Sequence, residues 1–339
     1  MNDAAAFCDI PDCTARQPRD EASGAKRRAE APPRVSVIIV TYRNEGTIEA
    51  CLASLAARAA VWFETVVVDN SPDRATWERL QAFCRDHPDM AVTPLRPGTN
   101  LGFAAGCNLG ARHARGDFLL FLNPDTRLEN DILSIFLAFW KGRANPGLLG
   151  PLVLDGQGDT VRTCRNLPTV MGILLDATGL DRFLGRYRLP RCAHDRTQRV
   201  PQIIGACLFT SRPLYEAFGG MDERFFVYFE EVDLCTRMAG AGYEIWFLPE
   251  ARISHAAGAS CETGSAVAAM IVQLRKSRML YFRKHFGPAA TAAVGVLTVL
   301  EGAAKAAVLL ALYVARGERR HLEKAKGFWR VAACPGSWR

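Results

Sequence analysis

Side chains that can move protons or bind metal ions recur in this sequence directly after apolar segments. Acidic or amide residues follow three such segments and a histidine follows a fourth. They are Asp69; Asn123 and Asp125; Glu230, Glu231 and Asp233; and His255. Because parallel sheets bind ligands at the carboxyl ends of their strands, we expect these side chains to meet at one edge. Carboxylate oxygens suit Mg²⁺ or Mn²⁺, and Mn²⁺ also accepts imidazole, so the pattern predicts a divalent-cation site that neutralises a diphosphate.

The elements that must position these residues alternate through the first 125 residues or so. Continuous apolar runs predict buried strands over 35–41, 64–68 and 118–122. Apolar residues at helical spacing predict helices over 47–60 and 73–87. This alternation predicts an α/β fold with a parallel sheet and right-handed crossovers.

The second half of the sequence has a less regular pattern. The segment 155–201 is rich in Arg, Asp, Gly and Pro, which is typical either of a substrate lid or of a plain surface insertion. Further strands are expected over 202–210, 225–229 and 243–248. The acidic cluster then begins a helix, in which Asp233 and Arg237 are four residues apart and suited to an ion pair.

Composition indicates one large α/β domain with appendages, because 49% of the 339 residues are hydrophobic and 23% are charged. Residues 265–339 contain thirteen Lys and Arg against three Glu, whereas the remainder of the chain is slightly acidic. Positive charge beside apolar segments predicts contact with an anionic membrane surface. We expect no nucleic-acid partner, because the sequence lacks a recognised nucleic-acid-binding module.

Cysteine usage and the first residues indicate a cytoplasmic protein. The eleven cysteines form no Cys-x-x-Cys pair, and several lie inside apolar elements, as reduced thiols do. Residues 1–33 are polar and end in two prolines, so we expect a disordered leader. The leader has no basic start followed by an apolar core, so a signal peptide is not expected.

The C-terminal region 265–339 is expected to be helical. Its apolar stretch 289–315 is interrupted by Glu301 and Lys305, and the uncharged runs are shorter than the roughly 20 residues that a spanning helix needs. This pattern favours one or two amphipathic helices lying in the membrane interface beside the basic residues. The alternative is a helix pair packed on the catalytic domain.

Five short motifs occur in a fixed order between residues 35 and 286. They lie at 36–44, 67–71, 100–103 with Asn108 and Gly110, 122–125, and 229–237. In this order they resemble the motifs of inverting glycosyltransferase family 2, and most of all its bacterial rhamnosyltransferase-like branch. The resemblance implies the GT-A nucleotide-sugar-binding fold, with a mainly parallel central sheet, over 34–264.

The resemblance also implies which residues hold the substrate and the metal ion. The first two strand ends would hold the nucleotide base and ribose. The implied substrate-binding residues are Thr41, Tyr42, Arg43, Asp69, Asn100, Gly102, Asn108 and Asn123. Asp125 would bind Mn²⁺ or Mg²⁺ and the donor diphosphate, and His255, in a pattern with Gly258 and Ser260, would complete the metal site. Asn123 stands where many members carry a second Asp.

The acidic cluster resembles the catalytic motif of the family. Inversion needs one base to take the acceptor hydroxyl proton while the opposite face of the sugar loses the nucleoside diphosphate. Glu231 stands at the position usually held by Asp and is the expected base, with Glu230 in reserve. The preceding aromatic run would desolvate the carboxylate and raise its pKa. Asp233 is expected to orient the helix through Arg237.

These inferences predict a metal-dependent inverting glycosyltransferase at the inner face of the cell membrane. It would move one sugar, rhamnose by analogy, from a nucleotide-diphosphate sugar to a lipid-linked or glycan acceptor in surface polysaccharide synthesis. The alternative is a non-catalytic nucleotide-sugar-binding scaffold, because Asn123 and Glu231 replace Asp. A processive synthase, a dinucleotide-dependent enzyme and a nucleotidyltransferase are disfavoured, because their motifs are absent from the sequence.

Overall fold

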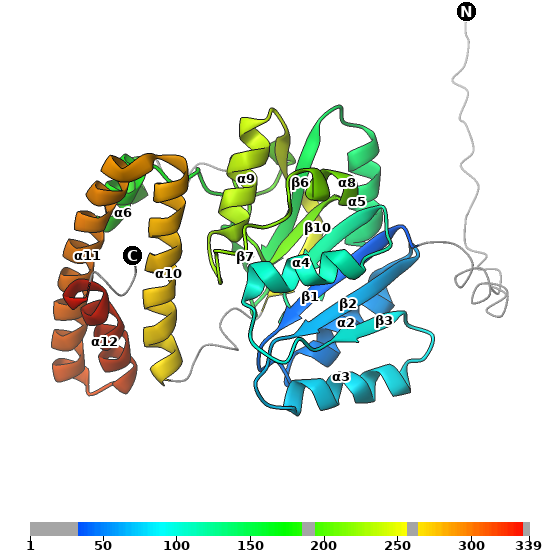
Figure 1. Cartoon of the computed structure of the whole chain (residues 1–339), viewed down its shortest axis with the longest axis horizontal. Helices are drawn as coiled ribbons and strands as arrows, with labels where there is room; N and C mark the ends of the chain where they lie inside the picture. The colour runs from blue at the N-terminus through cyan, green and yellow to red at the C-terminus, as the bar shows by residue number, and fades with distance from the viewer. Residues whose placement is uncertain (1–32, 185–193, 256–263, 335–339) are drawn as a thin grey trace, which may run out of the picture. The chain divides into compact units, whose positions relative to one another are not determined.

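The computed structural model describes residues 33–184, 194–255 and 264–334, and the chain from Pro33 onwards forms one compact unit (Figure 1). The expected leader lies outside the described residues except for Pro33, and so do Gly258 and Ser260. The proposed division of the remaining chain at residue 264 stays a prediction.

A single mixed sheet forms the centre of the fold. Its main strands follow the order β3-β2-β1-β4-β9-β6-β10-β5, while β7 pairs with β6 and β8 pairs with β10. The strands are β1 Val35–Thr41, β2 Phe63–Asp69, β3 Val92–Leu95, β4 Phe118–Leu122, β5 Thr126–Leu128, β6 Pro146–Leu154, β7 Thr160–Val161, β8 Gln198–Arg199, β9 Cys207–Ser211 and β10 Glu244–His255.

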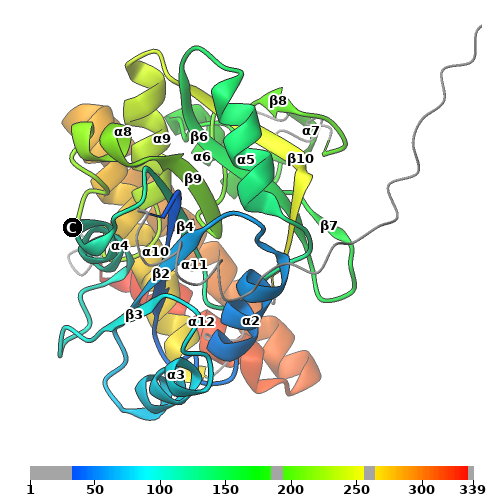
Figure 2. The same cartoon turned by 90° about the vertical axis from the view of Figure 1, so that its right-hand side faces the viewer.

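Helices cover both faces of this sheet, and three further helices follow it in the chain (Figure 2). They are α2 Ile48–Arg58, α3 Ala75–Asp86, α4 Phe103–His113, α5 Ile132–Lys141, α6 Val170–Ala177, α7 Asp181–Leu184, α8 Arg212–Ala217, α9 Glu230–Gly240, α10 Gly264–His285, α11 Gly287–Arg316 and α12 Arg319–Ala333.

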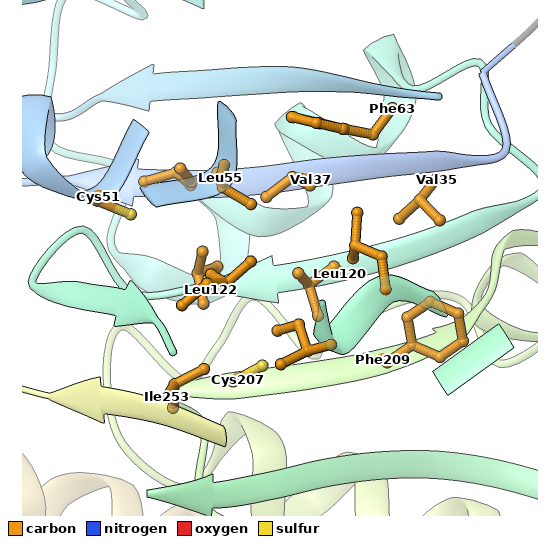
Figure 3. Packing of buried hydrophobic residues seen from close by; sticks show 14 of the residues in the cluster. Val35, Val37, Cys51, Leu55, Phe63, Leu120, Leu122, Cys207, Phe209 and Ile253 are labelled. Atoms are coloured by element: carbon orange, nitrogen blue, oxygen red, sulfur yellow. The ribbon is translucent and has the colours of Figure 1, made fainter. Parts of the chain in front are cut away.

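The alternating side chains of β1 divide the core into two layers. Val35, Val37 and Ile39 pack in the cluster that includes α2 and α5, part of which Figure 3 shows. Ile38 and Val40 pack in the cluster that includes α4 and α9. This separation follows from the strand period of two, and it places helices on both faces of the sheet, as the α/β prediction required.

The α/β fold class is confirmed, but the sheet is more mixed than the sequence indicated. β3, β2, β1 and β4 are parallel, as are β6 and β10, whereas β9 runs antiparallel to both β4 and β6. The first residue of β9, Cys207, pairs with the last residue of β4, Leu122. The chain therefore re-enters the sheet at the carboxyl edge of β4 and runs back, which reverses the direction of β9.

Two strand predictions were wrong in ways that affect the site. The segment 225–229 is not a strand, because Tyr228 and Phe229 both have a φ of 69°, which is incompatible with pairing in a sheet. β10 does not stop near residue 248 but continues through a register shift to His255. The histidine thus belongs to the strand rather than to a loop after it.

The segment 155–201 is more structured than its irregular sequence indicated. It contains β7, which pairs with β6, the helices α6 and α7, and β8, which pairs with β10. Ile173 of α6 packs in a cluster with Val294 of α11, so this insertion contacts the C-terminal helices. The structure does not test its predicted role as a lid.

The C-terminal region forms three helices that pack on one another. Glu301 and Lys305 do not interrupt α11, because Glu301 turns inward and accepts hydrogen bonds from Arg275 (2.8 Å) and Arg278 (3.0 Å) of α10. Among the described residues, α11 is the one helix long and apolar enough to cross a membrane by length and composition. The buried ion pairs hold α10 and α11 together.

Candidate active site

The carboxyl ends of β1 and β2 hold a buried carboxylate with one oxygen available. Thr41 pairs with Asp69 in the parallel register, and its hydroxyl donates to Asp69 Oδ1 at 3.0 Å. The Ser71 amide donates to the same oxygen at 3.1 Å. Asp69 Oδ2 is buried without a hydrogen-bond partner among the described residues, and Arg96 Nε lies 4.0 Å away. A ligand hydroxyl or ring N–H donating to Oδ2 would satisfy it.

The turn after β1 is held in a strained conformation beside Asp69. Arg43 has a φ of 57°, and its amide donates to Ser71 Oγ at 2.8 Å. The Tyr42 amide donates to Asn44 Oδ1 at 2.8 Å, while the Tyr42 ring is 41% exposed. The turn therefore presents an aromatic ring next to a buried carboxylate, an arrangement that suits a nucleoside.

Asn70 connects this edge of the sheet to the start of α4. Its side-chain amide donates to the Gly102 carbonyl at 2.9 Å. Gly102 has a φ of 85°, and a Cβ there would overlap the Phe226 carbonyl, which accepts a hydrogen bond from the Phe103 amide at 2.6 Å. The turn at 100–103 is thereby fixed to the segment that precedes the acidic cluster.

The structure brings Asp125 and His255 together, although they are 130 residues apart. β5 pairs with β10 so that Thr126 lies opposite His255, and His255 Nε2 lies 3.0 Å from Asp125 Oδ1. Their side chains are 11% and 14% exposed, so a small ion can reach them. This pairing agrees with the two predicted metal ligands, whose role stays a prediction.

The metal site would have few protein ligands. Within the described part of the chain, no group of three or more His, Cys, Asp or Glu side chains is placed to hold a metal ion. A cation between Asp125 and His255 would therefore need substrate phosphates and water as its other ligands. Mg²⁺ is commonly bound in this manner in enzymes that act on phosphates, so the pair fits a cation that arrives with the donor diphosphate.

Glu230, which is buried, and Glu231, which is half-buried, begin α9. Burial raises the pKa of Glu231, although Arg165 and backbone hydrogen bonds oppose the shift. Burial and the neighbouring Glu231 charge raise the pKa of Glu230 well above its usual range. The Oε2 atom of each is buried without a hydrogen-bond partner among the described residues. The largest cause of both pKa shifts is therefore burial, which disfavours the charged form of a carboxyl group.

Glu231 is connected to the edge that carries Asp125. A Cβ at Gly205 would lie 3.6 Å from the Glu231 carboxyl carbon, and the next residue, Ala206, accepts a hydrogen bond from the Asn123 amide at 2.9 Å. Two consecutive left-handed residues, Tyr228 and Phe229, turn the chain into α9 and cost about 1 to 3 kcal/mol each. Such strain clusters at functional sites.

Asp233 is fixed by three basic side chains. Arg237 Nε lies 2.7 Å from Asp233 Oδ2, while Lys284 Nζ and His285 Nε2 lie 2.6 Å and 2.8 Å from Oδ1. Burial favours a higher pKa, but the hydrogen bonds from Lys284, His285 and Arg237 lower it. The predicted contact with Arg237 is present, and the ion pairs also connect α9 to α10.

Two of the expected substrate-binding asparagines are used within the protein. Asn108 donates to the Met221 carbonyl and Glu223 and accepts from Tyr215 and the Met221 amide, so its amide has no group left for a ligand. Its predicted role in substrate binding is therefore replaced by a structural one. Asn100 accepts a hydrogen bond from the Gly102 amide at 2.9 Å and shapes the turn before α4.

Sequence reasoning missed Asn70 and Arg96. Asn70 directly follows Asp69, so its place at the strand end was visible, but its bond to Gly102 depends on the tertiary fold. Arg96 lies 27 residues after Asp69, in an ordinary turn sequence, and no local pattern indicated that it would approach the carboxylate.

The order and directions of the strands, with helices on both faces, define the GT-A class of transferase fold. Residues 36–216 match the family described as Glycosyl transferase family 2. This match covers more than half of the chain, and the chain belongs to glycosyltransferase family 2. Its membership supports glycosyltransferase activity.

Two curated relatives have described activities. The chain is 27% identical over 272 residues to the N-acetylglucosaminyl-diphospho-decaprenol L-rhamnosyltransferase of Mycobacterium tuberculosis, covering 74% of this chain and 85% of the relative. It is 30% identical over 208 residues to the low-salt glycan biosynthesis hexosyltransferase Agl10 of Haloferax volcanii, covering 60% of this chain and 61% of the relative. The relatives act in rhamnosyl and hexosyl transfer, as their names state.

Solved structures support the fold. The mannosyltransferase PcManGT from Pyrobaculum calidifontis, in complex with GDP-Man and Mn²⁺, aligns with a TM-score of 0.54 and 18% identity over 92% of each chain. GalNAc-T7 with UDP, GalNAc and Mn²⁺ aligns with a TM-score of 0.52 and 17% identity, covering 73% of this chain and 48% of that one.

Proposed function

We propose that this protein is an inverting, metal-dependent glycosyltransferase that moves one sugar from a nucleotide-diphosphate sugar to a lipid-linked acceptor of a surface polysaccharide. The observation that carries the proposal is the Glu231 carboxylate, whose Oε2 atom is buried without a hydrogen-bond partner among the described residues and whose pKa is raised by burial, which makes it a stronger base than an exposed glutamate. The rhamnosyltransferase relative favours L-rhamnose as the sugar and a diphosphate-linked lipid as the acceptor.

The donor nucleotide would lie at the ends of β1 and β2. Asp69 Oδ2 would accept a hydrogen bond from the ribose or base, and Tyr42 would contact the base. Thr41 and the Arg43 backbone hold this turn in place. Asn123 lies two residues before Asp125 and would contact the donor beside the Asp125–His255 pair. Gly102, which has no Cβ, allows the start of α4 to lie against the Phe226 carbonyl.

Proton transfer would rest on Glu231. The acceptor oxygen attacks the anomeric carbon from the face opposite the nucleotide, and the bond between that carbon and the diphosphate oxygen breaks. The hydroxyl proton passes to the Glu231 carboxylate, and the nucleoside diphosphate leaves. Burial and the neighbouring Glu231 charge raise the pKa of Glu230, which favours its neutral form beside the base. Asp125 and His255 would hold Mn²⁺ or Mg²⁺, which when bound offsets the negative charge of the diphosphate.

The base is tested by substituting the two glutamates separately. Glu231→Gln should lower the transfer rate about 10²- to 10⁴-fold, the usual contribution of a general base, while donor binding survives. The measurement is release of nucleoside diphosphate with a prenyl-diphosphate N-acetylglucosamine acceptor, beside donor binding by calorimetry. Glu78→Gln, on the exposed face of α3, is the matched control. Full activity of Glu231→Gln combined with loss of activity in Glu230→Gln would transfer the role to Glu230.

The metal assignment is tested by binding as well as activity. EDTA should abolish transfer and added Mn²⁺ should restore it. Asp125→Asn should weaken Mn²⁺ binding in the presence of nucleoside diphosphate by about tenfold or more, since one of two protein ligands loses its charge. The exposed Asp89→Asn is the control. Turnover that persists in EDTA would refute the roles given to Asp125 and His255.

A second candidate is a non-catalytic scaffold that binds a nucleotide sugar. Asn123 in place of Asp and the small number of metal ligands favour this candidate. It predicts donor binding without release of nucleoside diphosphate, with or without acceptor and Mn²⁺. A screen of donors with purified protein and Mn²⁺ separates the two functions.

A further inference from the structure

A large groove lies between α10 and α11, outside the site described above. Its volume is about 1250 Å³, more than the roughly 300–1,000 Å³ of a pocket for a drug-sized ligand. α12 packs against the start of α10, where Gly327 approaches Ala268, and against the middle of α11, where Gly302 approaches Phe328. The groove is lined by α10 residues from Gln273 onwards and by the first part of α11.

The charges that line the groove are all positive. Arg224, Lys276 and Arg283 line it, and no acidic residue among the described ones does. Arg224 is paired with Asp222, whereas Lys276 and Arg283 are exposed and form no ion pair within the described part of the chain. An anionic group of the ligand would therefore find two available cations and a third close by.

The remaining lining is mainly apolar and continues to the surface of α11. Val296 and Leu300 line the groove and are 60% and 61% exposed. Further along the same helix, Val308 and Val314 are also exposed. An apolar chain that leaves the groove would thus meet more apolar surface, so the groove fits an amphiphile with an anionic head.

One end of the groove is connected to the proposed catalytic glutamates. Phe226 lines the groove, and its carbonyl accepts the Phe103 amide at the start of α4. Ser277, another lining residue, donates to the Val227 carbonyl at 2.7 Å. The same segment continues directly into α9, so the anionic head of a bound ligand would lie on the side of the groove that leads to Glu231.

We infer that this groove seats an isoprenoid diphosphate, the carrier of the acceptor sugar, with the diphosphate on Lys276 and Arg283 and the first isoprene units between α10 and α11. The inference rests on the proposed function, because only transfer to a lipid-linked sugar requires such a carrier next to the base. A single prenyl chain with a diphosphate matches a groove with clustered cations better than a two-chain phospholipid with one phosphate.

Two neighbouring alanines of α11 provide a matched test. Ala292 lines the groove and Ala293 does not, although both are exposed. In the full-length protein, Ala292→Phe should weaken binding of farnesyl diphosphate at least about tenfold, and Ala293→Phe should leave it unchanged. Lys276→Gln and Arg283→Gln should each weaken it several-fold, whereas Lys324→Gln, an exposed lysine of α12, should not. Binding is measured by calorimetry.

Binding measurements with related ligands distinguish the possible occupants of the groove. Farnesol and inorganic diphosphate should each bind much more weakly than farnesyl diphosphate, because each has only one of the two recognised parts. Equal effects of Ala292→Phe and Ala293→Phe would overturn the inference, as would binding of inorganic diphosphate that is as tight as binding of farnesyl diphosphate. Donor binding and Mn²⁺ binding should be unchanged in all variants. Groove binding without sugar transfer would refute the proposed function alone, and transfer insensitive to Ala292→Phe would refute the groove alone.

Discussion

Glu230 and Glu231 are adjacent carboxylates whose burial decides their chemistry. An exposed pair at a helix start would be ionised and stabilised by the helix dipole. Here burial raises the pKa of both, and the charge of Glu231 raises that of Glu230 further. Environments that raise the pKa values of two like groups to different extents can divide the roles of acid and base between them.

The pH dependence of transfer follows from the raised pKa of Glu231. The base must be ionised, so kcat/KM should fall as pH falls through a pKa above the ordinary glutamate value of 4.5. Arg165 lowers this pKa, so Arg165→Gln should move the acidic limb to higher pH. The measurement is kcat/KM against pH for both proteins. An acidic limb at the ordinary value, or one that moves to lower pH in Arg165→Gln, contradicts the assignment.

At the scale of elements, the start of α4 connects the carboxyl ends of β1 and β2 to the segment before α9. Gly102 is held by Asn70 on one side and contacts Phe226 on the other. A glycine is required here for two reasons, the positive φ and the absence of room for a Cβ. Displacing this turn would disturb the proposed donor edge together with the helix that carries the proposed base.

Gly102→Ala should lower both stability and activity. The backbone strain costs about 1 to 3 kcal/mol, and the overlap with the Phe226 carbonyl adds to it. Gly98→Ala is the matched control, because Gly98 has a φ of 83° but nothing within 4 Å of a Cβ. Chemical denaturation should show a larger loss in Gly102→Ala than in Gly98→Ala. Equal losses would show that backbone strain alone matters and that the Phe226 contact does not.

On the scale of the whole molecule, exposed apolar side chains concentrate in the C-terminal helices and the insertion before β9. Exposed large apolar residues in α6, α7, α11 and α12 include Met171, Phe183, Leu184, Val296, Leu300, Val308, Val314 and Trp329. On the described part of the sheet domain, few such residues are exposed. This distribution supports our proposal that the protein docks peripherally on the inner face of the cell membrane, with basic residues contacting anionic lipid.

Vesicle sedimentation tests this docking with the full chain. Val314→Asp should reduce the bound fraction on phosphatidylglycerol vesicles, because an inserted Val contributes about 1.5 kcal/mol or more, roughly tenfold in affinity. Ala56→Asp introduces the same charge on the exposed face of α2 and should have little effect. Added salt should weaken binding if the basic residues contribute. Equal losses in both variants would refute docking through α11.

The sequence by itself determined the α/β class, the strands β1, β2 and β4, and the polar residues at their ends. These features are local, because a buried strand is a continuous apolar run and a turn ends it within a few residues. The motif order also predicted the family, which the match over residues 36–216 confirmed. The antiparallel course of β9 was not predicted, since strand direction depends on where the chain re-enters the sheet.

Only the tertiary structure decided which of the polar residues meet. His255 reaches Asp125 because β10 passes through a register shift and pairs with β5, and periodicity near residue 248 gave no sign of that extension. Asn108 was assigned to substrate, yet its partners at 215–223 occupy its amide completely. Glu301 looked like an interruption of α11 until α10 supplied arginines to pair with it. Each outcome depends on contacts between residues distant in the chain, which local patterns do not specify.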